Sequence, residues 1–327
     1  MITINENGFF KDEFGEVEDG ALSEPLKFVY RKSTKDLFVV IKIDESLTYD
    51  PWKEVSCAGV VIKAQDLLSP SGYRTNKYFD RIKKAGGLHE YFGCDVDMIL
   101  SSIMPDKMLY GFSVQAYADM INTLQPDYYY TPDGETYLGE EWLSQMEINR
   151  VCADTRYLIR TFPNIKPIGL VKGCNIHQID NHTNYLRRSG ISRLVFHTGD
   201  YICRGSSAAI EQAIFFASSI RKKAPYLLVN GLGSMSSLKN FNFSDGIVTQ
   251  NHFVEAFNGH FCNTDRSSGE RRAVSRNDIM NNLRNIERNV SAIRLQKSLA
   301  DWILSDGELS DGHHVLSDGS MNSRGGS

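Results

Sequence analysis

Short runs rich in β-branched residues alternate with helical segments along most of the chain, and this alternation is the feature that most constrains the fold. Buried strands are expected at 37–43, 58–62, 98–100, 127–131, 167–171, 193–196, 226–229 and 246–249. Helical patterns lie between them at 72–85, 113–123, 140–161, 176–188 and 206–223. About eight repeats of strand and helix predict the α/β class, as a (β/α)₈ TIM barrel with a C-terminal helical extension.

Four parts of the chain follow from this pattern. Residues 1–35 are mixed and polar and predict an N-terminal arm or edge hairpin, and 36–262 form the barrel. Residues 263–304 predict a basic helical extension, because apolar residues recur there at helical spacing. Residues 305–327 are rich in Ser, Gly and Asp and predict a disordered tail. With 41% hydrophobic residues among 327, the chain can bury a core as large as a barrel requires.

Composition and motifs exclude several classes of protein. The first twenty residues are acidic and lack the order of a signal peptide, and no apolar run has membrane-spanning length, so we expect a cytoplasmic protein with no membrane partner. The six cysteines form no CxxC pair, which argues against a metal site. No nucleotide or cofactor motif is present, and we expect no cofactor.

Asp133 is the first candidate for chemistry. It follows three tyrosines typical of a buried strand, and the Pro-Asp-Gly sequence ends that strand abruptly. In a parallel barrel the carboxyl ends of the strands converge on the substrate, so a carboxylate there is well placed for catalysis. The alternative is that Asp133 only shapes an Asp-Gly turn.

The C-terminal extension is the best candidate for binding nucleic acid. The net charge of −4 argues against binding through bulk charge, but basic residues outnumber acidic ones between 266 and 297. The candidates for contact with the nucleic-acid backbone are Arg271, Arg272, Arg276 and Arg284. A solvated helix face would have the same composition.

Four segments, in order and at the right spacing, carry a resemblance to a known family. They are GGLHEYFGCDVDMILSS (86–102), LQPDYYYTPDG (124–134), LVKGC (170–174) and SDGIVTQNHFVEAFNG (244–259). They resemble the GGLH…LTDS segment, the strand ending in a base-binding aspartate, the IVQGG motif and the VDMFD…ARNG segment of the tRNA-guanine transglycosylase superfamily. The resemblance covers roughly residues 56–261. Members of that superfamily are barrel enzymes that exchange a nucleic-acid base by cutting its N-glycosidic bond.

The departures from the family pattern concern its catalytic groups. Ser101 stands where the family has the aspartate of LTDS, and Lys172 stands where it has the glutamine that reads guanine. The position of the family's nucleophilic aspartate falls on Val248, which leaves only the earlier Asp245. Asp133 is retained, and the family's CxCxxC zinc motif is missing.

The resemblance and these losses together imply hydrolysis rather than exchange. Exchange needs a covalent sugar–enzyme intermediate, which a valine cannot form. Hydrolysis needs a carboxylate beside an oxocarbenium-like sugar, a positioned water and help for the departing base. We therefore expect a DNA glycosylase, with Asp133 as the carboxylate and with Asp245, together with Asp200 or Asp106, as second candidates. Lys172 would hold the leaving base or a phosphate, or attack the sugar to form a Schiff base; a solvated strand-end lysine is the alternative.

Further residues at expected strand ends are candidates for binding the substrate. They are Ser101, Ser102, Asp106, Tyr130, His197, Asp200, Asn230 and Gly231. His197 is a general-acid candidate or only a capping residue. Tyr130 lies on the same side of its strand as Tyr128, where a ring either stacks on a flipped base or packs in the core.

The expected partner is DNA that carries a modified base, with RNA as the alternative. The guanine-reading groups are gone, so a modified base such as those of phage genomes, taken out of the helix by base flipping, suits the remodelled pocket and implies antiviral defence. Homodimer formation is left open. Two rival functions remain: a 7-deazaguanine transglycosylase that uses Asp245, and a non-catalytic binding subunit.

Overall fold

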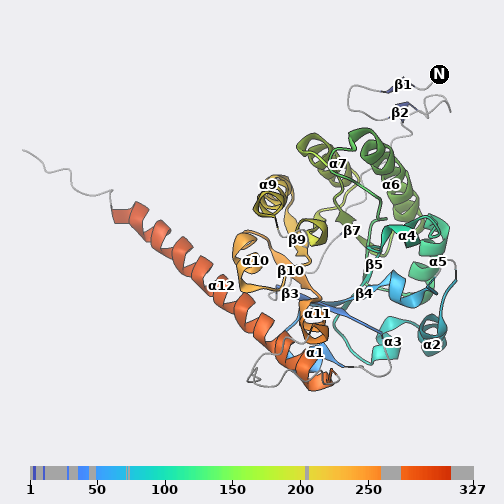
Figure 1. The fold of residues 1–327 in the computed structure, drawn as a ribbon, viewed down its shortest axis with the longest axis horizontal. Coiled ribbons are helices and arrows are strands. Elements are labelled where there is room, and N and C mark those ends of the chain that lie inside the picture. Colours follow the sequence, from blue (N-terminus) through green and yellow to red (C-terminus); the bar gives the residue numbers. More distant parts are fainter. Residues whose placement is uncertain are drawn as a thin grey trace, which may run out of the picture.

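Eight parallel strands close into a barrel in the computed structural model of the chain (Figure 1). They are β3 (Leu37–Ile41), β4 (Gly59–Lys63), β5 (Asp97–Ser101), β6 (Tyr128–Tyr130), β7 (Lys166–Leu170), β8 (Arg193–His197), β9 (Tyr226–Asn230) and β10 (Gly246–Thr249). Each strand pairs with the next in the sequence, and β10 closes the barrel on β3, with Ile247 opposite Leu37. The predicted (β/α)₈ barrel is therefore confirmed, with all eight strands at or within two residues of their expected positions.

The structure describes residues 3–4, 10–11, 28, 36–43, 49–70, 72, 74–202, 206–258 and 274–310. At 3–4, 10–11, 200, 235 and 299–310 it describes the backbone only. In the N-terminal part, β1 (Thr3–Ile4) pairs antiparallel with β2 (Phe10–Lys11). No helix in the described ranges is both long and apolar enough to cross a bilayer.

Helices surround the barrel. The longer ones are α2 (Lys77–Ala85), α5 (Val114–Leu124), α6 (Glu141–Thr161), α7 (Ile176–Arg188), α9 (Ser207–Lys223) and α12 (Arg276–Ser310). The short ones are α1 (Pro51–Glu54), η1 (Ala64–Leu67), α3 (Leu88–Phe92), α4 (Asp106–Leu109), α8 (Gly199–Ile202), α10 (Met235–Asn240) and α11 (Asn251–Phe257). Side-chain caps fix several starts: Asn76 accepts hydrogen bonds from the amides of Tyr78 and Phe79, so α2 begins at Lys77 and not at the expected residue 72.

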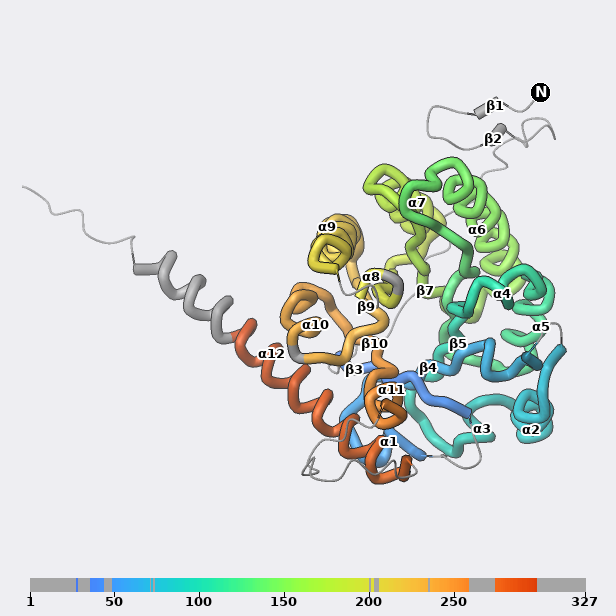
Figure 2. Tube along the Cα trace, in the orientation of Figure 1, coloured from blue at the N-terminus to red at the C-terminus, as the bar shows by residue number. Residues whose placement is uncertain are grey.

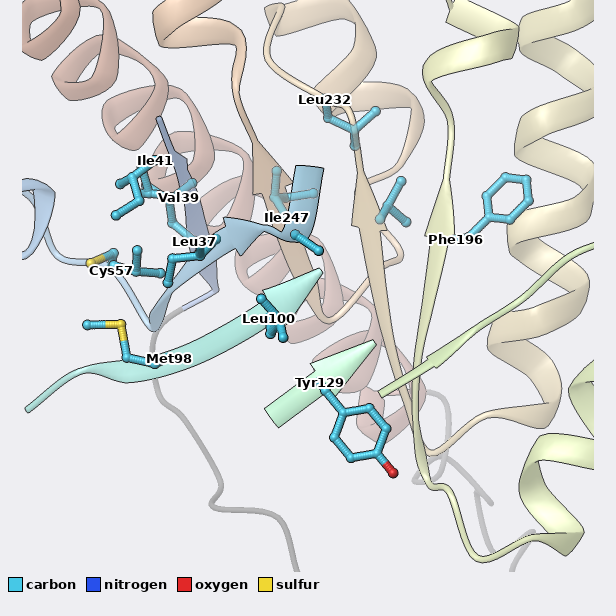
Figure 3. Packing of buried hydrophobic residues seen from close by; sticks show 14 of the residues in the cluster. Leu37, Val39, Ile41, Cys57, Met98, Leu100, Tyr129, Phe196, Leu232 and Ile247 are labelled. Carbon is cyan, nitrogen blue, oxygen red and sulfur yellow. The ribbon is translucent and has the colours of Figure 1, made fainter. Parts of the chain in front are cut away.

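The alternation of side chains along each strand divides the core into two layers. Outward side chains pack under the helices, and Figure 3 shows Leu37, Val39 and Ile41 of β3 with Met98 and Leu100 of β5 in this layer. Inward side chains fill the barrel with a second apolar cluster. Its buried members are Phe38, Val40, Val61, Ile99, Tyr128, Tyr130, Ile168, Leu170, Val195, Leu228 and Val248. The barrel interior is thus packed, and any site must lie above this layer.

A buried arginine occupies the amino-terminal end of the barrel interior. Arg193, the first residue of β8, is 3% exposed. Its guanidinium lies 5.1 Å from the ring centre of Tyr128 and 4.7 Å from that of Tyr226. These cation–π contacts help to close the end of the barrel opposite the expected catalytic face.

Helix α12 packs on the outside of the barrel, beside α1, α10 and α11 (Figure 2). Its stripe of Ile279, Leu283, Ile286, Val290 and Ile293 is buried, as the spacing predicts. The helix continues past the predicted end at 304, to Ser310. Residues 263–273 of the predicted extension, and 311–327 of the predicted tail, lie outside the described residues.

Candidate active site

A cavity of about 470 Å³ opens at the carboxyl ends of the barrel strands. Loops after β5, β6, β7 and β8 contribute to its wall. Its volume lies within the range of about 300–1,000 Å³ that is typical of small-molecule sites. In a barrel of this kind it occupies the face on which catalytic groups gather.

A ring of polar side chains lines this cavity. Inward-facing positions recur every second residue, so the residue two places after the last apolar inward residue of a strand faces the cavity. The ring consists of Lys63, Ser101, Lys172, His197, Asn230 and Gln250, which follow Val61, Ile99, Leu170, Val195, Leu228 and Val248. The apolar barrel interior therefore forms the floor of a polar site.

Asp133 and Lys172 form an ion pair in the wall of the cavity. Lys172 Nζ donates to Asp133 Oδ1 at 2.9 Å, and the two side chains are 15% and 6% exposed. The Gly134 amide donates to the same oxygen at 2.8 Å, and the Met104 amide lies 3.4 Å from Oδ2. All three partners are hydrogen-bond donors, so the Asp133 carboxylate acts only as an acceptor. Its Oδ1 accepts two short hydrogen bonds, whereas Oδ2 accepts only one long one.

Side chains of α6 and α7 hold the backbone of both residues of this pair. Arg150 of α6 donates from Nη2 to the Asp133 carbonyl at 3.0 Å, and it also pairs with Glu147 and Asp154. On the other side, the Lys172 amide donates to His182 Nδ1 at 3.0 Å. Burial lowers the pKa of His182 to about 4, so its ring is neutral at pH 7 and its Nδ1 can accept. The site is thus supported by α6 and α7.

A second lysine lines the same cavity. Lys63 is the last residue of β4 and donates from Nζ to Gln250 Oε1, which follows β10. Burial lowers the pKa of Lys63; Asp66 opposes that effect and Lys42 adds to it. The hydrogen-bond partner of Lys63 is therefore a neutral amide, whereas that of Lys172 is a carboxylate.

Tyrosines and carboxylates form one side of the rim. Tyr137 donates to Asp106 Oδ2 at 2.7 Å, and Tyr110 donates to Glu135 Oε2 at 2.8 Å. Tyr110 is 81% exposed and Tyr137 38%. Burial and the hydrogen bond to Asp106 raise the pKa of Tyr137. Of these residues, Asp106, Glu135 and Tyr137 line the cavity, so a ligand there would meet a phenol and two carboxylates.

His197 lies under the first residue of α8. A Cβ at Gly199 would lie 2.6 Å from His197 Nε2, so glycine is needed there for the ring to keep its position. The neighbouring strand end is held by Thr198 Oγ1, which donates to the Asn230 carbonyl at 2.8 Å. His197 and Asn230 therefore face the cavity from a closely packed pair of strand ends.

Most of the predicted site residues meet at this cavity. Those that line it are Ser101, Asp106, Asp133, Lys172, His197 and Asn230. Three others do not line it. Ser102 points the other way and donates to the Thr131 carbonyl at 2.7 Å. Gly231, with φ of 102°, donates its amide to Val248 O, and Tyr130 is fully buried inside the barrel.

The predictions for Tyr130 and Ser102 are wrong for two different reasons. Tyr130 is the last residue of β6, but its side chain lies in the packed inner layer, so it belongs to the core and not to the substrate-facing ring. Ser102 follows Ser101 by one residue, which places it on the opposite side of the strand. Gly231 lies past the strand end in a left-handed conformation, away from the cavity. Asp200 lies on α8, and the structure does not describe its side chain.

Asp245 is also not at the cavity. It immediately precedes β10 and so lies at the amino-terminal end of that strand, opposite the cavity. Its carboxylate accepts from Arg221 Nη2 at 3.0 Å and from the Leu227 amide at 2.8 Å. Val248, at the position of the family's nucleophile, is fully buried in the barrel interior. The prediction that Asp245 acts in the same site as Asp133 is therefore wrong.

The predicted nucleic-acid contacts divide into three kinds. Arg271 and Arg272 lie outside the described residues. Arg276 is exposed at the start of α12. Arg284 is not a free cation, because its Nη2 lies 2.5 Å from Glu54 Oε2 and the pair joins α12 to α1. The pair helps to dock α12, and contact of Arg284 with nucleic acid stays a prediction.

Lys63 and Gln250 are the residues that sequence reasoning missed. The expected strands ended at 62 and 249, one residue short of each. Extending the alternation from Val61 and Val248 by two residues would have found both. The described residues contain no group of three or more His, Cys, Asp or Glu side chains placed to hold a metal ion.

We compared the chain with models of known protein families and with curated proteins. No family model matches it. No curated protein matches it either.

Proposed function

We propose that the protein is a DNA glycosylase that hydrolyses the N-glycosidic bond of a modified nucleobase and leaves an abasic site. The observation that carries this proposal is the buried Asp133–Lys172 pair in a cavity of about 470 Å³ at the carboxyl ends of the strands. An enzyme that acts on a base must take it out of the helix stack and into such a pocket. The resemblance to the transglycosylase superfamily is part of the proposal.

The two side chains supply complementary charges to this reaction. As the bond between C1′ and the base nitrogen lengthens, positive charge develops on the sugar, and the Asp133 carboxylate stabilises it. The bonding electrons leave with the base, and Lys172 donates a hydrogen bond to that base. Water then adds to C1′, and Asp133 accepts the proton that the water loses.

The arrangement supports hydrolysis over base exchange. Exchange needs a carboxylate that holds the sugar covalently until a second base arrives. At the end of β10 the inward side chains are Val248 and Gln250, neither of which can do so. Asp245, which a transglycosylase would use, is engaged by Arg221 at the other end of the barrel.

The proposal extends to the substrate and its setting. The rim residues Tyr137, Asp106 and Glu135 carry phenol and carboxylate oxygens that can accept further hydrogen bonds, which favours a base with a polar, hydrogen-bond-donating substituent. Modified bases of this kind occur in phage DNA, so we place the activity in the cytoplasm as antiviral defence. RNA is the alternative substrate, and a homodimer is the alternative to a monomer.

The test is to incubate the protein with phage DNA whose bases are naturally modified, and with DNA of the same sequence built from ordinary bases. Aldehyde-reactive labelling counts abasic sites, and mass spectrometry identifies the released base. We expect abasic sites and a free modified base from the first DNA only, and neither from the Asp133→Asn variant. The absence of both products from every modified DNA tested would refute the proposal.

A further inference from the structure

Lys63 has no role in the reaction described above, although it lines the same cavity as Asp133 and Lys172. It stands at the inward-facing end of β4, and Val61 below it belongs to the packed interior. Its Nζ donates a hydrogen bond to the amide oxygen of Gln250, the residue that follows β10. A lysine in this position is fixed, reaches the cavity and has no carboxylate as its hydrogen-bond partner.

The surroundings of Lys63 make its ammonium group easier to deprotonate than that of an exposed lysine. Burial lowers the pKa of Lys63, and the nearby Lys42 acts in the same direction, while Asp66 acts against both. Lys172 and His197 also line this cavity, and the Asp133 carboxylate is already paired with Lys172. An amine is a nucleophile only when unprotonated, so a desolvated lysine whose hydrogen-bond partner is a neutral amide is suited to attack a carbonyl group.

We propose that Lys63 is a nucleophilic amine that forms an imine with an aldehyde in this cavity, the aldehyde being the open-chain sugar of an abasic site. The choice of aldehyde rests on the proposed glycosylase function, because that reaction produces an abasic sugar in contact with the same cavity. Lys63 Nζ adds to C1′ and the adduct loses one molecule of water, which leaves a C1′=N double bond. No oxidant or reductant is required.

The imine gives the enzyme a second activity. Once the imine is protonated, a base can remove a proton from C2′, and the electron pair of that bond moves towards the C1′=N⁺ group to give an enamine. The enamine then expels the phosphate: a C2′–C3′ double bond forms as the C3′–O bond breaks, the C1′=N⁺ bond is restored, and the phosphate leaves with the bonding pair, so the DNA strand is cut on the 3′ side of the abasic sugar. Asp133 and Lys172 would thus release the base, and Lys63 would act on the product.

The experiment uses an oligonucleotide that carries a preformed abasic site, so it does not depend on base removal. The full-length protein is mixed with this DNA and with sodium borohydride, which reduces an imine to a stable amine. A covalent complex on a denaturing gel reports the imine, and mass spectrometry of its peptides identifies the attached residue. We expect attachment at Lys63, and a decrease of at least about tenfold in Lys63→Met and Lys63→Arg. Lys107→Met, an exposed lysine of α4 that does not line the cavity, should trap as well as the unchanged protein.

The outcomes separate this inference from the proposed function. Attachment mapped to Lys172, trapping that persists in both Lys63 variants, or no trapping at all would overturn the role of Lys63, even if modified bases are released from DNA. Trapping at Lys63 without any base release would instead support the amine chemistry and count against the glycosylase. Peptide mapping in the unchanged protein needs no variant to fold, and Lys63→Arg keeps a long basic side chain at that position.

Discussion

Asp133 and Lys172 come from the ends of neighbouring strands, β6 and β7, and meet with Oδ1 and Nζ 2.9 Å apart. Thirty-nine positions separate them in the sequence, so only the closed barrel brings them together. Arg150 donates a hydrogen bond to the backbone of Asp133, and His182 accepts one from the backbone of Lys172. The pair is therefore held in place before any substrate enters, as catalysis by fixed charges requires.

The first prediction concerns the carboxylate of this pair. Asp133→Asn keeps the shape of the side chain but removes the charge that would stabilise the sugar cation, so we expect base release to slow by about 10²-fold or more. Lys172 then lacks its partner, which should cost about 1–3 kcal/mol of unfolding free energy. Single-turnover base release and urea unfolding measure the two effects. Asp119→Asn, at an exposed carboxylate of α5 that does not line the cavity, is the matched control, and equal losses in both variants would contradict a special role for Asp133.

The second prediction separates hydrolysis from base exchange. Asp245→Asn should leave the rate of base release within about twofold of the unchanged protein, because Asp245 lies at the opposite end of the barrel. It weakens the contacts with Arg221 and the Leu227 amide, and so lowers stability by about 1 kcal/mol. Kinetics and thermal unfolding give the two values. A covalent DNA adduct that disappears in Asp245→Asn would support the transglycosylase instead.

The third prediction is a pH dependence caused by His182. The pKa of this buried ring is lowered from 6.5 to about 4, so below pH 6.5 the unfolded chain binds a proton that the folded chain does not. The contribution of His182 to the free energy of unfolding is fully present above pH 6.5. It is lost as the pH falls towards 4, and the loss amounts to as much as about 3 kcal/mol. The buried His252, with a pKa lowered to about 3, adds a loss in the same direction.

Urea unfolding between pH 7 and 4 measures this dependence. His182→Asn keeps an acceptor for the Lys172 amide but does not titrate in this range, so its stability should fall less steeply on acidification. His177→Asn replaces an exposed histidine on the same helix and should leave the slope unchanged. An identical pH profile for His182→Asn and the unchanged protein would show that His182 does not contribute.

The alternation of strands and helices was enough to predict the barrel, and the strand ends were enough to predict much of the site. Ser101, Lys172, His197 and Asn230 were all placed at strand ends from the sequence, and all four line the cavity. The reason is geometric, since parallel strands of a closed barrel bring their carboxyl ends to one face. A residue at such an end therefore reaches the site whatever its distance along the chain.

The level at which a side chain lies along the barrel axis could not be predicted in the same way. Tyr130 and Lys172 both face inward, but Tyr130 lies in the packed layer and Lys172 above it, and this difference depends on how neighbouring strands are staggered. The prediction for Asp245 is wrong for another reason. Asp245 is the acid nearest in the sequence to Val248, the position of the family's nucleophile. Strand β10 starts only at Gly246, so the Asp245 carboxylate lies at the amino-terminal end of the strand, opposite the cavity.

The fourth prediction concerns the ring of His197. A methyl group at position 199 would lie 2.6 Å from Nε2 and must displace the imidazole, because carbon and nitrogen atoms do not approach so closely. Gly199→Ala should therefore alter binding or catalysis if His197 touches the substrate, with a stability cost of about 1–3 kcal/mol from overpacking. Gly139→Ala is a control for adding a methyl group, since its Cβ would meet no atom within 4 Å, although its φ of 87° carries a strain of its own. Unchanged kinetics in Gly199→Ala would place His197 outside the reaction.

The last prediction distinguishes helix docking from DNA binding along α12. Arg284 is paired with Glu54, so Arg284→Ala should lower the unfolding free energy by no more than about 1 kcal/mol and leave DNA affinity almost unchanged. Arg276 is exposed, and if it contacts a phosphate, Arg276→Ala should reduce the slope of log K against log salt by about 1. Fluorescence anisotropy with labelled DNA over a range of salt concentrations measures the slope. A smaller slope in Arg284→Ala but not in Arg276→Ala would reverse these assignments, because it would mean that the Glu54 pair opens to let Arg284 reach the phosphates.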